Sequence, residues 1–120
     1  MVDSSLTENE RFVEVDFYDT DLDGRRFISC RFNGRAKLDG LDLSDVRLAE
    51  ADLSESSLKR VVFDDADLTG ATLRGCDLRE ADLRGARVDS VNLAGARFGS
   101  TRMDVDGALA VAVAQGIVIG

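Results

Sequence analysis

The sequence predicts an all-β protein whose chain coils repeatedly about one axis, and three observations predict it. A large apolar residue recurs at every fifth position from Leu38 to Met103. The position two residues earlier is small or apolar in most units, and the position directly before the large residue is polar in nearly all of them. The chain contains no proline, whose missing N–H would interrupt a ladder of backbone hydrogen bonds between coils.

A period of five fits neither a helix nor a flat strand. Residues five apart on an α-helix point about 140° away from each other, so they cannot share one buried face. In a strand, a shift of five residues reverses the face. The chain must therefore turn a corner after each five-residue unit and return as a coil, and successive coils stack about 4.8 Å apart.

The large inward position defines the coil along the chain. Its upstream members are Phe17, Leu22, Phe27 and Phe32, with Phe12 as an earlier member. Its later members are Leu38, Leu43, Leu48, Leu53, Leu58, Phe63, Leu68, Leu73, Leu78, Leu83, Val88, Leu93, Phe98 and Met103. Phe32 and Leu38 are six residues apart, which predicts one extra residue near Gly34 and Arg35.

The two ends depart from the repeat. Residues 1–10 are expected to form a polar lead-in, residues 11–105 the coil, and residues 106–120 a C-terminal cap. Asp104 or Asp106 can cap the N-terminus of a helix over about 107–115, Gly116 can end that helix, and residues 117–119 have strand character. The helix carries no charged residue, and an apolar surface on all its sides predicts a second burial surface.

Four units show the repeat most literally, namely Ala51-Asp52-Leu53, Ala66-Asp67-Leu68, Ala81-Asp82-Leu83 and Val91-Asn92-Leu93. They resemble the A(D/N)LXX repeat of the pentapeptide-repeat family, and the resemblance extends over about residues 10 to 105. It implies a right-handed quadrilateral β-helix with four pentapeptides per coil, hence about 4.5 coils. Arg25 departs from the pattern, because it occupies a small inward position.

The resemblance also implies an oligomeric state. In the gyrase-acting members that this chain resembles, the C-terminal end forms a twofold dimer. We therefore expect a head-to-head homodimer through the uncharged C-terminal segment. The expected interface residues are Leu109, Val111, Val113, Ile117, Val118 and Ile119.

The chain is acidic, with 15 Lys and Arg residues against 23 Asp and Glu residues and a formal net charge of −8. This balance argues against direct nucleic-acid binding, which requires excess positive charge.

With four units per coil, the excess of negative charge collects on one side of the coil, which we name the acidic column. Its members are Asp21, Asp23, Asp42, Asp45, Asp64, Asp65, Asp82 and Asp104. Arg84 and Arg102 are the basic residues on that side, and the other three sides are balanced.

Two functions are compatible with the acidic column. Several family members that this chain resembles are DNA mimics, which occupy the DNA-binding surface of type II topoisomerases and protect DNA gyrase from quinolones or toxins. The acidic column would then imitate one side of a nucleic acid. Alternatively, the protein is a structural or protein-interaction scaffold without gyrase activity, and the aspartates only keep it soluble.

An enzyme is not expected from this sequence. It contains no histidine, no metal-ligand cluster and no phosphate-binding glycine loop, and no cofactor is implied.

The two cysteines and the ends of the sequence bear on the compartment. Cys30 and Cys76 occupy small inward positions about two coils apart, where they are expected to pack in the core rather than form a disulfide. The polar first ten residues show no signal peptide, and the longest apolar run is too short to span a membrane, so a cytoplasmic protein is predicted.

Overall fold

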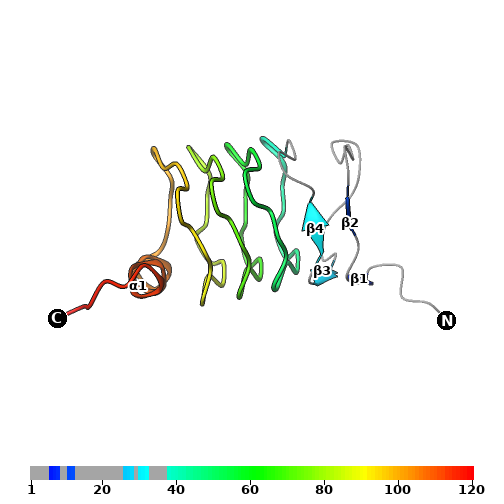
Figure 1. The fold of residues 1–120 in the computed structure, drawn as a ribbon. Helices are drawn as coiled ribbons and strands as arrows, with labels where there is room; N and C mark the ends of the chain where they lie inside the picture. Colours follow the sequence, from blue (N-terminus) through cyan, green and yellow to red (C-terminus); the bar gives the residue numbers. More distant parts are fainter. Residues whose placement is uncertain (1–5, 9–10, 13–25, 29, 33–37) are drawn as a thin grey trace.

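The computed structural model describes residues 6–8, 11–12, 26–28, 30–32 and 38–120. These residues form the strands β1 (Leu6–Glu8), β2 (Arg11–Phe12), β3 (Arg26–Ile28) and β4 (Arg31–Phe32), and the helix α1 (Val105–Ala114). The strand β1 pairs in parallel with β3, and β2 pairs in parallel with β4, in both cases with partners twenty residues apart (Figure 1). The expected inward residues at 17 and 22 lie outside the described residues.

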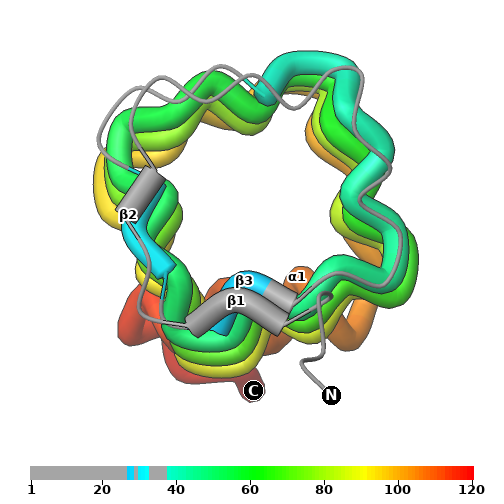
Figure 2. Tube along the Cα trace, turned by 90° about the vertical axis from the view of Figure 1, so that its right-hand side faces the viewer, coloured from blue at the N-terminus to red at the C-terminus, as the bar shows by residue number. Residues whose placement is uncertain are grey.

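The same register continues through the rest of the coil. Parallel bridges join residues twenty apart, from Asp42 with Val62 to Asp82 with Arg102. Viewed along the axis, the successive coils superpose on one four-sided outline (Figure 2). Each five-residue unit contributes one bridging residue between two turns, so beyond residue 38 the described coil is built from isolated bridges rather than strands.

From residue 38 onwards, the corners of the described coil have the backbone geometry of type II turns. In a representative corner, the carbonyl of Leu73 accepts a hydrogen bond from the amide of Cys76 at 3.1 Å, and Gly75 has a φ of +68°. Every fifth residue from Gly40 to Ser100 has a positive φ, whereas the residue before it does not. This combination defines type II. The corner after each unit, which the sequence predicts, is therefore made by the backbone in the same way each time.

The inward side chains form one continuous core along the axis. Phe63, Leu68 and Cys76 are fully inaccessible to solvent, and the polar residue Ser56 is buried among them. Cys76 donates a hydrogen bond to the Leu53 carbonyl at 2.9 Å, and burial raises the pKa of its thiol to about 11. Cys30 and Cys76 are both buried and do not form a disulfide with each other, as expected for packing residues.

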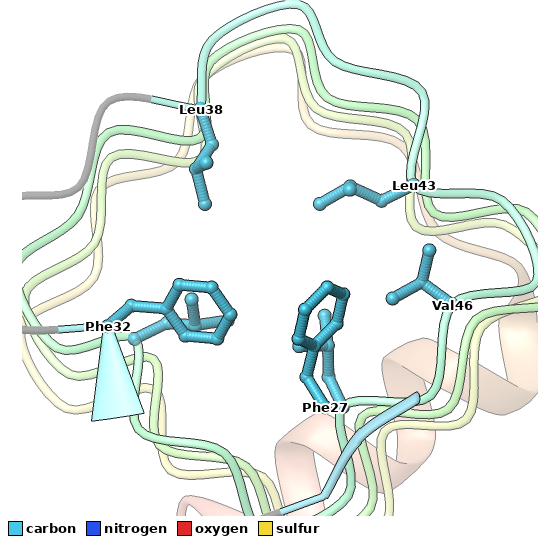
Figure 3. Close-up of a pocket in the computed structure, with 7 residues that line it drawn as sticks. Phe27, Phe32, Leu38, Leu43 and Val46 are labelled. Atoms are coloured by element: carbon cyan, nitrogen blue, oxygen red, sulfur yellow. The ribbon is translucent and has the colours of Figure 1, made fainter. Parts of the chain in front are cut away.

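The extra residue predicted between two units is confirmed by the register. Arg31 bridges to Asp52, which is twenty-one residues later, whereas the bridges further along the coil span twenty. The predicted position at residues 34 and 35 lies outside the described residues. Around this wider coil, Phe27 and Phe32 pack edge to face with ring centres 5.7 Å apart, and with Leu38 they surround a small apolar space (Figure 3).

Ser56 gives a direct test of the inward position. Its hydroxyl is buried without a hydrogen-bond partner, whereas Ala96 holds the equivalent position two coils later. We expect Ser56→Ala to stabilise the fold by about 1–2 kcal/mol, because an unsatisfied buried hydroxyl costs about that much. Urea unfolding measures the change. The control is Ser57→Ala, which should destabilise instead, because the Ser57 hydroxyl donates to Asp39. A loss of stability in Ser56→Ala would contradict this account.

The helix α1 follows the last bridge and has a defined start and end. The side chain of Asp104 caps it by accepting a hydrogen bond from the Gly107 amide at 2.7 Å. At its end Gly116 has a φ of +85°, and the amides of Gly116 and Ile117 donate back to Val113 and Ala112. This is a Schellman motif. The observed helix therefore starts two residues earlier and ends one residue earlier than the expected 107–115.

The predicted strand character of residues 117–119 is wrong for this structure. These residues form no strand, because they leave α1 in a direction away from the coils and pair with no backbone among the described residues (Figure 1). No helix among the described residues has the length and apolar character needed to cross a membrane.

Candidate functional site

The twenty-residue register brings the described part of the acidic column to one side of the coils. Bridges connect Asp42, Val62, Asp82 and Arg102 in a single row. The row therefore alternates acidic, apolar, acidic and basic side chains. Asp21 and Asp23 lie outside the described residues, and the described part of the column begins at Asp42.

The turns place a second row of aspartates beside the first. The Asp45 amide donates to the carbonyl of Asp64 in the next coil at 2.9 Å. Asp45 and Asp65 occupy the same left-handed position in successive coils, with φ of +61° and +57°. Two like charges are therefore stacked one coil apart, about 4.8 Å along the axis.

Two members of the column are engaged within the protein. Arg84 donates from Nε and Nη2 to the two carboxylate oxygens of Asp82, at 2.9 and 2.7 Å. These hydrogen bonds from Arg84 lower the pKa of Asp82 to about 2, and in return Asp82 raises the pKa of Arg84, with a weaker contribution from the charge of Asp64. Asp104 accepts from the Gly85 amide at 2.8 Å as well as capping α1, and these bonds lower its pKa.

Asp42 is held in place but remains exposed. One of its carboxylate oxygens accepts from the Ser44 amide at 3.0 Å and from the Ser44 hydroxyl at 2.5 Å. These two bonds lower the pKa of Asp42, the hydroxyl contributing most. The second oxygen has no hydrogen bond within the described part of the chain, so it can accept one from another molecule.

Asp45, Asp64 and Asp65 form the exposed centre of the column. Their side chains make no hydrogen bond or ion pair with another described residue. The stacked charges of the neighbouring side behave differently, because Arg60 lies 3.9 Å from Glu80 in the next coil. The structure thus compensates the stacked charges of Arg60 and Glu80, and it leaves the stacked charges of Asp45 and Asp65 uncompensated.

A second surface lies at the C-terminal end and is apolar. Five of the six predicted dimer residues are exposed, and Val118 is the most exposed at 90%. Val111 is partly buried and packs against the core instead. The exposed residues of this end are Phe98, Val105, Leu109, Val113, Ile117, Val118 and Ile119.

Comparison with known proteins identifies the chain. A family model described as pentapeptide repeats, in eight copies, matches residues 35–65 and 62–99. The chain belongs to the pentapeptide-repeat family. A search of curated protein sequences finds no match to this pentapeptide-repeat protein.

Solved structures of other pentapeptide-repeat proteins are similar to this chain. Rfr23 from the cyanobacterium Cyanothece 51142 is 19% identical with a TM-score of 0.41, over 82% of this chain and 88% of its own. A trypsin-treated variant of QnrB1, a plasmid-mediated fluoroquinolone resistance protein, is 17% identical with a TM-score of 0.27, over 96% and 92%. A protein from the Arabidopsis thaliana thylakoid lumen is 29% identical with a TM-score of 0.26, over 57% and 59%.

Sequence reasoning missed two features of the site in this pentapeptide-repeat protein. It placed Asp82 and Arg84 on the same side of the coil but did not predict that they form an ion pair two residues apart. It also treated Phe98 as an inward residue, whereas the side chain is 48% exposed. The sequence contains a signal for this exposure, because the repeat stops at Met103 and no repeat unit follows one coil later to cover Phe98. Among the residues described here, no group of three or more acidic or sulfur ligands could hold a metal ion.

Proposed function

We propose that this pentapeptide-repeat protein is a non-enzymatic protein-binding module whose acidic column meets a basic surface on its partner. One observation carries the proposal, namely the stacking of exposed Asp45 on exposed Asp65 without a compensating partner among the described residues. Like charges directly opposite each other on neighbouring strands destabilise a fold. Stability therefore does not account for this stacking, whereas attraction to a basic surface does.

The rigidity of the coil supports this role. The aspartates project from bridges and type II turns, whose backbone is fixed by hydrogen bonds to the adjacent coils. A surface that is organised before binding loses less conformational entropy when the partner arrives. The family fold further supports a right-handed quadrilateral winding, in which the column runs straight along the axis.

DNA gyrase is the narrower candidate partner. The described column holds six aspartates against Arg84 and Arg102, which leaves a net of four negative charges. B-DNA carries one charge per about 1.7 Å of its axis, so the column is a sparse imitation of DNA. Its exposed centre at Asp45, Asp64 and Asp65 is the part that would occupy a DNA-binding surface. A scaffold without gyrase activity is the alternative, favoured by the engagement of Asp82 and Asp104 within the protein.

We also propose that the protein acts as a homodimer joined at its C-terminal ends. The helix α1 exposes Leu109 and Val113, at 42% and 63%, and the tail beyond it exposes further apolar side chains. A contiguous apolar surface of this kind marks an interaction site. Head-to-head association would place the acidic columns of two copies along one longer rod.

Binding to purified DNA gyrase tests the narrower candidate. The experiment measures the affinity of the full-length protein for gyrase by biolayer interferometry, together with gyrase supercoiling activity with and without a quinolone. The column variant carries Asp45→Asn, Asp64→Asn and Asp65→Asn. We expect it to lose at least about tenfold in affinity, since these carboxylates form the exposed centre of the column.

A matched control removes the same number of charges elsewhere. It carries Glu55→Gln, Glu80→Gln and Asp89→Asn, all exposed on the other sides of the coil. Loss of binding in the column variant and retention in the control support the acidic column as the binding surface. Equal loss in both would show that only net charge matters. An absence of binding by the wild type at tens of micromolar would remove gyrase as the partner.

A further inference from the structure

The backbone ladder is left open at the C-terminal end of the coil. The amides of Leu73 and Leu78 donate to the carbonyls of Asn92 and Arg97 in the next coil, at 2.7 and 2.9 Å. One coil later, the amides of Leu93 and Phe98 have the same places in their units but no backbone acceptor among the described residues. The carbonyl of Ala96 is equally unused, whereas its equivalent on Cys76 accepts from Arg97 at 2.8 Å.

The helix α1 covers only part of this open edge. Gly107 is buried beside Val88, and Ala110 and Val111 pack against the core from the same side. Figure 1 shows α1 lying across one part of the end of the stack. Phe98 stays 48% exposed, although Leu78 at the same position one coil earlier is fully buried. A groove between the last coil and α1 is lined by Phe98, Thr101, Met103, Ala108 and Val111.

The exposed tail has the side-chain order of a repeat unit. In the unit Val61-Val62-Phe63, the first and third side chains are fully buried and the middle one is outward. The tail segment 117–119 has the same order of apolar residues, so as an added strand it would point Ile117 and Ile119 inward and Val118 outward. The third of these is sixteen residues after Met103, which is not a multiple of five, so the tail is out of phase with the coil of its own chain.

We propose that the tail 117–119 of one copy adds as a strand to the open edge at Ala96–Phe98 of a second copy, and that the exchange is reciprocal. This inference rests on the proposed homodimer and specifies how it forms. Ile119 would cover Phe98, and Ile117 would cover Ala96. The Phe98 amide would donate to the Val118 carbonyl, and the Val118 amide would donate to the Ala96 carbonyl. The ladder between coils has the same pattern.

A second copy fits this edge better than another kind of partner does. Exposed strand edges invite pairing with an extended segment, and the tail is an apolar segment that its own coil leaves unpaired. The chain carries a net charge of −8, so two copies repel each other at most approaches. The C-terminal end is the exception, because residues 107–120 contain no charged side chain. Depletion of charge is typical of interface centres.

The oligomeric state of tail variants tests the exchange. Sedimentation velocity of the full-length protein at micromolar concentration should show a dimer. We expect Ile119→Lys to weaken the dimer roughly thirtyfold or more, as for a buried interface residue. The matched control Val118→Lys should leave the dimer intact, although Val118 is the more exposed side chain at 90% against 54%. Val118→Pro should dissociate the dimer, because it removes the amide that donates to Ala96.

The outcomes separate the exchange from the dimer itself. A wild-type monomer at these concentrations would overturn both. A dimer that survives Ile119→Lys and Val118→Pro but dissociates with Leu109→Lys would keep the homodimer and overturn the exchange. A dimer that Val118→Lys weakens as much as Ile119→Lys would also overturn it, because a simple apolar patch then accounts for the association. Circular dichroism checks that each variant keeps the fold.

Discussion

Leu68→Lys is expected to leave the protein unfolded at room temperature. Leu68 has no exposed surface, and it lies in the middle of the stack between Leu48 and Val88 at the equivalent positions one coil on each side. An ammonium group there would be buried without a partner, which costs several kcal/mol in addition to the lost packing. The whole stability of a small domain is about 5–15 kcal/mol. Far-ultraviolet circular dichroism and urea unfolding measure the loss.

The matched control for Leu68→Lys is Arg87→Ala. The Arg87 carbonyl accepts from the Leu68 amide at 2.8 Å, so the two residues are neighbours in the ladder. The Arg87 side chain is exposed, and its removal should change the free energy of unfolding by less than about 0.5 kcal/mol. Equal losses in the two variants would contradict the inward and outward assignment.

Asp67 would be a poor control, although it is outward and adjacent to Leu68. Its carboxylate accepts from the Thr69 amide at 3.0 Å and from the Thr69 hydroxyl at 2.6 Å. Partial burial opposes its ionisation, but the hydrogen bonds from Thr69 and the charges of Arg87 and Arg47 outweigh that burial, and the pKa of Asp67 is lowered. Replacing Asp67 would therefore remove a structural bond of the turn as well as a charge.

The sequence predicts the coil well because its core is periodic. The five-residue spacing of the large side chains requires a corner after each unit, and the register of twenty follows from four such units per coil. The six-residue gap before Leu38 predicts the one extra residue, which shifts the Arg31 bridge to Asp52. The helix start follows from Asp104, because a capping side chain needs an amide three residues later.

The candidate sites are less predictable, because they depend on which side chains find partners. The sequence shows that Asp77 and Asp82 both precede an inward leucine, and in the structure both pair with the arginine two residues later. Spacing of two is not a contact distance in a helix, but around a type II turn these side chains lie together. The end of the coil is also hard to predict, since only a further coil would bury Phe98, and residues 104–120 do not form one.

Thr72→Pro is expected to destabilise the protein by about 3 kcal/mol or more. Thr72 lies in a central row of bridges between Asp52 and Asn92. Its amide donates to the Ala51 carbonyl at 2.9 Å, and its carbonyl accepts from the Leu53 amide at 2.8 Å. Proline removes the first bond, so the Ala51 carbonyl loses its donor, and it places a ring against the adjacent coil. Thermal unfolding followed by circular dichroism measures the change.

The control for Thr72→Pro stands two residues later in the same unit. Arg74 is the second residue of the type II turn that ends in Cys76, and no backbone acceptor among the described residues uses its amide. Proline is favoured at that position, because its fixed φ matches the turn. Arg74→Pro should therefore be neutral or stabilise by up to about 1 kcal/mol, through a less flexible unfolded chain. If both prolines were equally damaging, the corners could not be type II turns; if both were tolerated, the ladder would not depend on the Thr72 amide.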